Sequence, residues 1–526
     1  MRPDDWILDD PHVCIPDVLQ SYGTYQPEKE AVVCGDTRRT WGVFNANANR
    51  IGNALVDSGI AKGDKVAVLM GNSVEMLEVV FGAVKSGACV VPLSGLLTGE
   101  QLAALIEDSG ACAVTATADF REKLAPHLER LTSVPQSRRI AALSPDNGWI
   151  DLEQFTSGCS HTPPVVVYQP SDEFNIIYSS GTTGLPKGIV QTHRARLHWA
   201  FSNALEMGFT RSSRALTTTA LYSNGTWLMM LPSLFVGGTL VVMPEFDAEQ
   251  FVSTVEQERI THTFMVPAQY QMVLEHPSFD RYDTSGLEIL LCAGSPLRRA
   301  TKEEVIRRFG DKLIELYGFS EGFGTMLKPG QHQEKMDSVG VPVLGFEYRI
   351  LDEEGNELPP NTPGEIAGYG AGIMKEYHGK PEQTRELIWR DERGRTFIRS
   401  GDVGMCDEDG FLKIVDRKKD IIISGGLNVF PADIEEIVVQ HPDVTDVTVI
   451  GVPHPKWDET SLALVIPRQG GEADSQAIRD WCNERLAKHQ QLHGVEFREE
   501  FPRNALGKVL RRLLREPYWR DDGASA

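Results

Sequence analysis

The chain has 526 residues, which is more than one hydrophobic core usually serves, so at least two domains are expected. Hydrophobic residues make up 41% and charged residues 24%, as in soluble globular proteins, and no apolar run approaches the roughly 20 residues of a membrane-spanning helix. Acidic residues outnumber basic ones 74 to 52, a net charge of −22. This charge argues against nucleic acid or an anionic membrane as the main partner, and no integral membrane association is expected.

Cysteine usage and the chain ends point to the cytoplasm. The eight cysteines are scattered and form no C-x-x-C pair, so neither a disulfide framework nor a zinc site is expected. Residues 1–5 lack the pattern of a secretory signal, and the C-terminal tripeptide is no peroxisomal address. We therefore predict a cytoplasmic protein with reduced thiols.

The first half of the chain alternates strand-like and helix-like segments. Residues 65–70 and 89–92 are apolar runs typical of buried strands, and residues 74–86 between them have the period of an amphipathic helix. The same alternation gives a helix at 100–109 and strands at 113–115, 175–178, 239–243, 263–266 and 289–292. Strands separated by helices predict doubly wound α/β layers.

The second half has a different texture. Short strands and Gly/Pro turns after about residue 345 predict a β-rich subdomain at 345–416, followed by a charged cluster at 416–420. Beyond the cluster we expect strands at 444–450, 462–466 and 495–498 and helices at 475–488 and from 509 onward. The predicted organisation is a large N-terminal domain, 1–416, a hinge, 417–419, and a small mobile α+β domain, 420–526.

The strongest motif, S-S-G-T-T-G-L-P-K-G at residues 179–188, directly follows a predicted strand. Its glycines allow tight turns that present N–H donors, its hydroxyls add donors, and its lysine adds a cation. The string is not a Walker A loop, which has another spacing and continues into a helix. A flexible surface loop is the weaker alternative. The pattern predicts a triphosphate site formed by Ser179, Ser180, Gly181, Thr182, Thr183, Gly184 and Lys187.

This string resembles the phosphate loop of the adenylate-forming superfamily, which includes acyl-CoA synthetases, aryl-CoA ligases, peptide adenylation domains and beetle luciferases. The likeness runs from about residue 20 to 515, with further motifs in family order. The resemblance implies a ligase that uses ATP and Mg²⁺ to make an acyl-adenylate and releases pyrophosphate. Coenzyme A then takes the acyl group as a thioester, and AMP leaves.

Residues 317–321, Y-G-F-S-E, resemble the family's Y-G-x-T-E segment, with serine in place of threonine. An aromatic ring can stack on adenine, a hydroxyl can bond a phosphate, and a carboxylate can hold Mg²⁺. The resemblance makes Glu321 the metal ligand. Residues 292–297, C-A-G-S-P-L, resemble a turn that borders adenine and the acyl group, and a purely structural turn is the alternative. The ATP-binding residues implied by these two segments are Gly294, Ser295, Tyr317, Gly318, Ser320 and Glu321.

Residues 400–402, S-G-D, resemble the element that binds the ribose, because the planar carboxylate of Asp402 suits two adjacent hydroxyl donors. Taken alone, this tripeptide is more often a turn. Segments 363–366 and 372–377, just upstream, resemble the β subdomain of the family.

The cluster D-R-K-K-D at 416–420 and the following S-G-G-L-N-V-F-P at 424–431 resemble the superfamily hinge. One site must first exclude water around ATP and later admit a thiol, and rotation of a small domain meets both demands. The resemblance places the pivot at Lys419 and Arg417 near the nucleotide, with Gly425 and Gly426 beside the coenzyme A tunnel. A solvated charge run is the alternative for the cluster.

Residues 502–508, P-R-N-A-L-G-K, resemble the closing motif of the family, whose lysine bridges the carboxylate and the α-phosphate. A cation there offsets charge that develops at the α-phosphorus. The catalytic residues implied by the whole resemblance are Lys508, Glu321, Lys187 and Arg417.

The resemblance to the superfamily implies that the segment Y-S-N-G-T-W-L-M-M, residues 222–230, lies on a helix beside the acyl site. Aromatic and thioether surfaces favour apolar ligands, so a bulky aromatic or medium-chain monocarboxylate is predicted rather than acetate or an amino acid. Core packing is an equal alternative for any single side chain. Tyr222 stands where many acyl-CoA synthetases carry histidine, which leaves substrate choice open. The predicted pocket residues are Tyr222, Trp227, Gly294 and Phe319.

The expected partners are a small carboxylic acid, ATP and coenzyme A, and a homodimer is left open. Three other functions share these motifs. A stand-alone adenylation enzyme would load an acyl carrier protein, a luciferase-like oxidase would use oxygen, and a non-catalytic sensor would only bind nucleotide or acyl group. Pyrophosphate release from ATP and acid separates an enzyme from a sensor.

Overall fold

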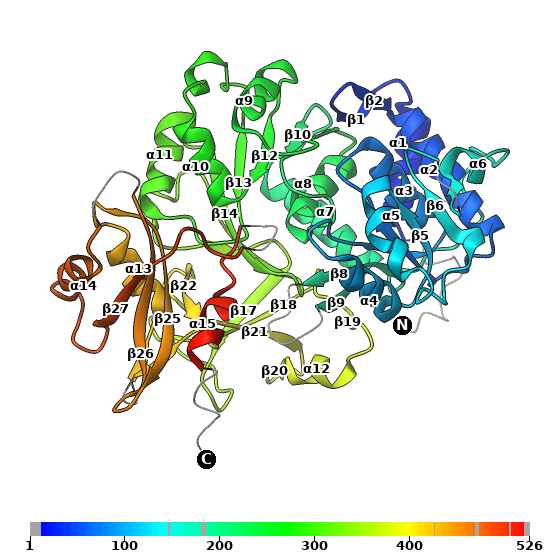
Figure 1. Ribbon diagram of the computed structural model, residues 1–526. Helices are drawn as coiled ribbons and strands as arrows, with labels where there is room; N and C mark the ends of the chain where they lie inside the picture. The colour runs from blue at the N-terminus through cyan, green and yellow to red at the C-terminus, as the bar shows by residue number, and fades with distance from the viewer. Residues whose placement is uncertain are drawn as a thin grey trace. The chain divides into compact units, whose positions relative to one another are not determined.

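The computed structural model describes residues 12–145, 148–179, 186–424, 427–468, 473–503 and 507–519 (Figure 1). These residues form two compact units. The first comprises Met1–Glu334, Pro342–Glu347 and Tyr369–Glu386, and the second comprises Lys335–Val341, Tyr348–Gly368 and Leu387–Ala526.

The first unit contains a sheet of eight strands in the order β19-β9-β8-β4-β3-β5-β6-β7. Its strands pair in parallel except for β8 with β9 and β9 with β19, which are antiparallel. The strands are β3 (Lys65–Leu69), β4 (Cys89–Pro92), β5 (Ala111–Ala116), β6 (Arg139–Ala141), β7 (Ile150–Asp151), β8 (Glu173–Ser179), β9 (Lys187–Thr192) and β19 (Glu376–Tyr377).

A second sheet of the same unit has nine strands in the order β16-β15-β14-β13-β12-β10-β11-β1-β2. Its strands are β1 (Glu30–Cys34), β2 (Thr37–Thr40), β10 (Arg214–Thr217), β11 (Thr239–Val242), β12 (His262–Met265), β13 (Ile289–Cys292), β14 (Leu313–Phe319), β15 (Phe323–Leu327) and β16 (Val341–Pro342). The predicted strands in both sheets are present, and the α/β class is confirmed.

Helices cover these sheets, and several begin at a side-chain cap. A hydroxyl or carboxylate that accepts the first free N–H groups stabilises a helix start. Such caps are Thr40, Ser73, Thr98, Asp151, Thr192 and Asp247. The helices are α1 (Ile15–Tyr25), α2 (Trp41–Asp57), α3 (Val74–Lys85), α4 (Gly99–Ser109), α5 (Ala118–Leu124), α6 (Leu152–Phe155), α7 (His193–Glu206), α8 (Asn224–Phe235), α9 (Ala248–Gln257), α10 (Pro267–Glu275), α11 (Arg299–Phe309) and α12 (Pro381–Glu386).

Two apolar cores hold helices against the sheets. Phe251 of α9, Tyr270 of α10 and Phe309 of α11 pack with buried residues of the nine-stranded sheet, and Figure 1 shows these helices along β12–β14. Leu105 of α4 and Phe120 of α5 pack in the same way with the eight-stranded sheet.

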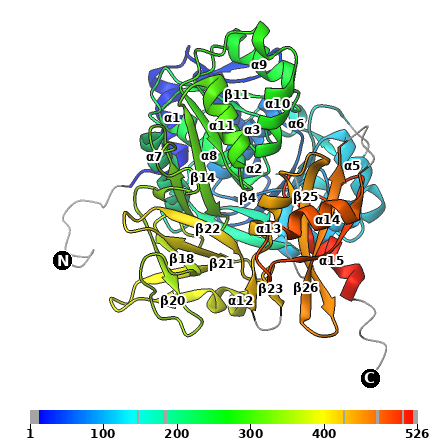
Figure 2. The same ribbon diagram turned by 90° about the vertical axis from the view of Figure 1, so that its left-hand side faces the viewer.

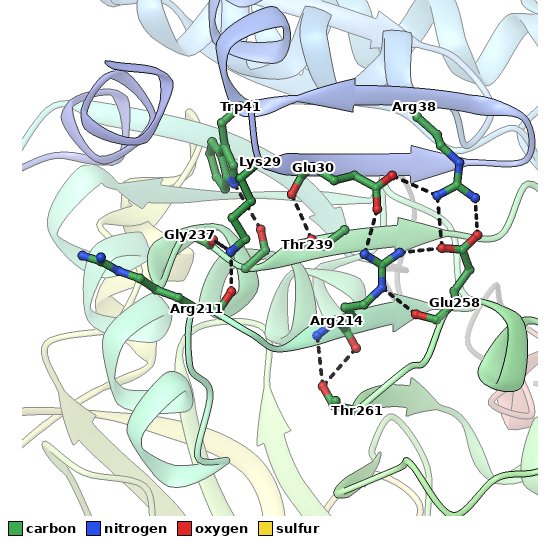
Figure 3. A network of polar contacts seen from close by, with 11 residues as sticks. Lys29, Glu30, Arg38, Trp41, Arg211, Arg214, Gly237, Thr239, Glu258 and Thr261 are labelled. Atoms are coloured by element: carbon green, nitrogen blue, oxygen red, sulfur yellow. Dashed lines mark hydrogen bonds and ion pairs between the residues drawn. The ribbon is translucent and has the colours of Figure 1, made fainter. Parts of the chain in front are cut away.

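A polar network joins β1 and β2 to β10 and to the end of α9 (Figure 3). Glu30 of β1 accepts Arg38 Nη1 at 2.9 Å and Arg214 Nη1 at 2.7 Å, and both arginines also pair with Glu258 after α9. The Lys29 ammonium donates to the carbonyls of Arg211 and Gly237 beside them. Because Glu30 and Glu258 each form ion pairs with both guanidinium groups, the network joins β1, β2, β10 and the end of α9.

The second unit contains a five-stranded sheet in the order β17-β18-β21-β20, with β22 paired to β21, which confirms the predicted β-rich subdomain. Its strands are β17 (Phe346–Leu351), β18 (Gly364–Gly370), β20 (Ile388–Arg390), β21 (Thr396–Cys406) and β22 (Leu412–Arg417).

The end of the chain forms an α+β module in the same unit. Its sheet has the order β24-β23-β26-β25, with β27 paired to β26. Side chains alternate along β25, so that Val447 and Val449 pack with α13 and α14, whereas Ile450 and Val452 pack with α15 on the other face (Figure 2). The elements are β23 (Ile422–Ser424), β24 (Leu427–Val429), β25 (Val444–His454), β26 (Asp458–Pro467), β27 (Leu492–Phe497), α13 (Pro431–Val438), α14 (Ser475–Asn483) and α15 (Arg511–Trp519).

Some boundaries differ from the sequence prediction. Helix α14 ends at Asn483, not 488, and α15 begins at Arg511, not 509. Strand β19, within the segment expected in the β subdomain, instead pairs with β9 in the first unit. The two compact units also divide elsewhere than at residue 416, because the β-rich sheet clusters with the C-terminal module.

All eight cysteines lie among the described residues, and each carries a free thiol. No helix in the described ranges has the length and apolar character needed to cross a membrane.

Candidate active site

The strands β8 and β9 form a hairpin whose ends carry the phosphate-loop motif. Ser179 ends β8 and lies opposite Lys187, the first residue of β9. The chain therefore turns back into a strand after the motif, as expected for a loop that is not a Walker A loop. The motif residues Ser180, Gly181, Thr182, Thr183 and Gly184 lie outside the described residues.

Residues 317–321 lie at the end of β14 and in the turn to β15. The two strands pair antiparallel, and Gln191 of β9 donates an amide hydrogen bond of 3.3 Å to the Ser320 carbonyl. Tyr317, Phe319 and Glu321 are all half-buried. The structure thus brings Glu321 to the strand that begins with Lys187.

Tyr377 of β19 contacts both of these charged residues. Its hydroxyl donates to the Glu321 carboxylate, and the Lys187 ammonium lies 4.7 Å from the centroid of its ring. Burial and the nearby Glu321 carboxylate raise the pKa of Tyr377, so its hydroxyl stays protonated. Sequence reasoning did not single out this residue, because its role depends on the pairing of β19 with β9.

The turn after β13 carries Gly294 and Ser295. Gly294 has a φ of +96°, which suits glycine. A buried ion pair between Lys302 of α11 and Glu315 of β14 lies under this turn, and the Leu297 backbone donates to Glu315. The turn is therefore anchored to the sheet, as its interpretation as an adenine border requires.

The segment predicted to line the acyl pocket precedes and begins α8. Tyr222 is half-buried, and burial raises the pKa of its phenol, so unlike a histidine it stays neutral at physiological pH. Trp227 is only 2% exposed, and its indole N–H donates to the Leu221 carbonyl at 2.9 Å. This burial favours the packing alternative for Trp227. Phe319 lies 5.6 Å from Phe323, centroid to centroid.

A buried arginine that sequence reasoning missed holds the start of α8. Arg196 of α7 donates to Asn175 of β8 at 2.7 Å and to Asn224 of α8 at 2.9 Å, and its guanidinium stacks on Trp227 at 4.7 Å. Burial lowers the pKa of Arg196 to about 9. The contacts couple the strand that leads into the phosphate loop to the segment containing Tyr222.

In the second unit, Asp402 of β21 and Arg417 of β22 are direct cross-strand partners. Arg417 Nε lies 3.1 Å from Asp402 Oδ1, and Asp402 is 5% exposed. Ser400 Oγ accepts from the Asp402 N–H at 3.0 Å and donates to the Ile366 carbonyl at 2.8 Å, while Gly401 has a φ of +72°. Residues 400–402 therefore lie within β21, at an irregularity in its pairing with β18, and they fix a buried carboxylate.

Lys508 belongs to the same cluster of charges. Burial and, to a smaller extent, the Arg417 guanidinium lower the pKa of Lys508 to about 8, although the Asp402 and Asp420 carboxylates act in the opposite direction. The structure thus brings together three residues, Asp402, Arg417 and Lys508, that are distant in the sequence.

Arg511, at the start of α15, connects carboxylates on both sides of the predicted hinge. Its guanidinium lies 2.7 Å from Glu435 Oε1, 3.3 Å from Asp416 Oδ1 and 3.5 Å from Asp420 Oδ2. Lys419 lies exposed in the turn after β22. Its role as the pivot stays a prediction, and Gly425 and Gly426 lie outside the described residues.

The residues fit a magnesium ion that arrives with ATP. Within the described ranges, no group of three or more His, Cys, Asp or Glu side chains could hold a metal ion. Mg²⁺ is usually bound by one or two carboxylates, waters and substrate phosphates, and not by an all-protein cage. A single carboxylate at Glu321, beside Lys187, meets this need.

Comparison with protein families shows to which family this chain belongs. The family model of AMP-binding enzymes matches residues 19–378. The chain belongs to this family. The model of the AMP-binding enzyme C-terminal domain matches residues 433–508, a range that ends at Lys508. This AMP-binding enzyme is therefore a member of the adenylate-forming superfamily, and the predicted family is confirmed.

Relatives with named activities match nearly the whole length of the AMP-binding enzyme. A feruloyl-CoA synthase of Amycolatopsis sp is 34% identical over 94% of this chain and 96% of its own length. The long-chain-fatty-acid–CoA ligase FadD13 of Mycobacterium tuberculosis is 33% identical over 95% of this chain and 98% of its own. The crystal structure of ATP-bound MatB from Rhodopseudomonas palustris superimposes with a TM-score of 0.88 at 27% identity, over 97% of this chain and 99% of MatB.

The predicted reaction class is confirmed by these relatives. The AMP-binding enzyme is an AMP-forming acid–thiol ligase that works through an acyl-adenylate and uses ATP and coenzyme A.

Proposed function

We propose that this chain activates a bulky, apolar monocarboxylate, aromatic or medium-chain, and transfers it to coenzyme A in the cytoplasm. The observation that carries the assignment of residues is the cluster of Asp402, Arg417 and Lys508. It combines a buried carboxylate suited to ribose hydroxyls with two cations suited to phosphate and carboxylate.

In the first half-reaction, a carboxylate oxygen of the acid attacks the α-phosphorus of ATP, and the bond to the pyrophosphate oxygen breaks. Lys508 stabilises the charge that develops in this step, and Lys187 holds the phosphates. Glu321 would hold Mg²⁺, which would supply neutralising charge for the phosphates. Asp402 accepts hydrogen bonds from the ribose, and Tyr317 stacks on adenine.

In the second half-reaction, the thiolate of coenzyme A attacks the carbonyl carbon of the mixed anhydride, and AMP leaves. Rotation about Lys419 withdraws Lys508 and admits the thiol beside Gly426. This motion separates a step that needs a dry site from one that needs an open path.

The substrate class follows from the side chains beside the nucleotide motifs. Tyr222 and Phe319 are half-buried aromatic residues, Phe323 packs behind Phe319, and Tyr222 is neutral. Such surfaces favour apolar substrate area, at about 25 cal/mol per Å² buried. Relatives named for ferulate and for long-chain fatty acids agree with this class.

The test is a specificity profile. We expect kcat/KM to be highest for octanoate, benzoate or a cinnamate and lowest for acetate and an amino acid, at saturating ATP and coenzyme A. Best activity with acetate or the amino acid would overturn the substrate class. A chain that forms adenylate with these acids but transfers it only to a carrier protein would instead be the carrier-loading enzyme.

A further inference from the structure

We propose that Tyr377 is a positioning residue that sets the Glu321 carboxylate and the Lys187 ammonium in place for MgATP. The inference rests on the proposed roles of Glu321 and Lys187, and it adds a third residue that holds both. Tyr377 is 4% exposed, and it offers its ring to the cation and its hydroxyl to the anion.

The backbone around Tyr377 is fastened to the elements that carry both charged groups. The Met374 N–H donates to the Glu321 carbonyl at 2.7 Å, and the His378 N–H donates to the Gly188 carbonyl at 2.7 Å. The Tyr377 N–H itself donates to Thr384 Oγ1 at 3.0 Å. The tyrosine ring is therefore placed by hydrogen bonds on either side of it.

The segment that leads to Tyr377 lies so close to the turn after Glu321 that this turn requires glycine. Gly322, next to Glu321, has a φ of +114°, and a Cβ at this position would lie 2.1 Å from the Gly372 carbonyl oxygen. The chain keeps two glycines in contact here, so that the segment leading to Tyr377 can lie against the turn.

The neutral Tyr377 side chain therefore lies in contact with two opposite charges, the Lys187 ammonium and the Glu321 carboxylate. The part of the chain that the structure describes contains no ion pair between Lys187 and Glu321, although both contact the same tyrosine. A direct pair would occupy the ammonium needed for phosphate and the carboxylate needed for the metal. Tyr377 instead gives the ammonium a cation–π contact and the carboxylate a hydrogen bond, both weaker than an ion pair. The phenol donates to one carboxylate oxygen, so the other oxygen would be open to Mg²⁺.

Hydrogen bonds that orient a metal-binding side chain typically change metal affinity or activity by 10- to 100-fold when they are removed. Tyr377→Phe deletes the hydroxyl and keeps the ring under Lys187. We expect it to weaken Mn²⁺ binding about tenfold in the presence of α,β-methylene-ATP, which cannot be cleaved at the reacting bond. The free Mn²⁺ signal in electron paramagnetic resonance measures this binding without turnover.

Tyr22→Phe is the matched control, because it also deletes a hydroxyl of the first unit, one that donates to the Phe235 carbonyl at 2.9 Å. It should bind Mn²⁺ as the native chain does. A double variant, Glu321→Ala with Tyr377→Phe, should bind no more weakly than Glu321→Ala alone, because the hydroxyl acts through that carboxylate.

Two outcomes would overturn the inference. One is Mn²⁺ binding by Tyr377→Phe within twofold of the native chain, whatever its melting temperature, which would leave the tyrosine with a packing role. The other is an equal loss in the native and Glu321→Ala backgrounds. If the native chain itself binds no Mn²⁺ with the analogue and exchanges no pyrophosphate, the proposed function fails instead.

Discussion

Lys508 should give the adenylation step an alkaline limit near pH 8. Burial lowers its pKa to about 8, so the ammonium is charged below that pH and neutral above it. A neutral amine cannot offset the charge that develops at the α-phosphorus. About nine-tenths of the free enzyme carries the charge at pH 7 and about one-tenth at pH 9, so kcat/KM for ATP should fall about tenfold between them.

Pyrophosphate exchange into ATP, at subsaturating ATP and saturating acid from pH 6.5 to 9.5, measures this limit. Lys508→Arg is the informative variant, because a guanidinium keeps its charge throughout this range. It should be slower than the native chain but flat up to pH 9.5. A native profile that is flat through pH 9.5, or the same alkaline limit in Lys508→Arg, would refute the reasoning.

Three further predictions concern binding and stability. Asp402→Ala should raise the dissociation constants of ATP and AMP alike, about 10- to 100-fold, because the ribose loses hydrogen bonds to a charged acceptor. Unchanged affinity in calorimetry would leave residues 400–402 with only a structural role in β21. Arg511→Met should cost about 3–5 kcal/mol in urea unfolding, because the half-buried Glu435 and the buried Asp416 lose their partner, and a loss below about 1 kcal/mol would show that they are solvated. Glu258→Gln should cost about 1 kcal/mol through the network of Figure 3, and the cost should shrink in 1 M KCl, whereas a salt-independent loss would contradict an electrostatic origin.

The site residues that sequence analysis identified lie in short contiguous motifs. Residues 179–188 and 317–321 each combine glycine, hydroxyls and a charged group within a few positions, and residues 502–508 combine a glycine with the charged Lys508, so their chemistry can be predicted without knowledge of the fold. Their mutual placement is not, because Lys508 joins Asp402 and Arg417 only through the packing of the second unit.

The residues that sequence analysis missed act through pairings between distant segments. Tyr377 matters because β19 pairs with β9, and Arg196 matters because α7 faces both Asn175 and Asn224. No local pattern distinguishes these side chains from ordinary core residues.

Element ends were misplaced where a tertiary contact overrides the helical period. Asn483 ends α14 because its side chain exchanges hydrogen bonds with the backbone of Leu492, at 2.7 and 3.0 Å. Val509 pairs with Arg503 in an isolated bridge, which delays α15 to Arg511.

The most direct test of the central claim is acid-dependent exchange of labelled pyrophosphate into ATP by the purified native chain without coenzyme A. The account predicts exchange with at least one bulky apolar acid, none without acid, and AMP and acyl-CoA in equal amounts once coenzyme A is added. Nucleotide binding without exchange for any acid of the panel would contradict it and leave the chain as a sensor.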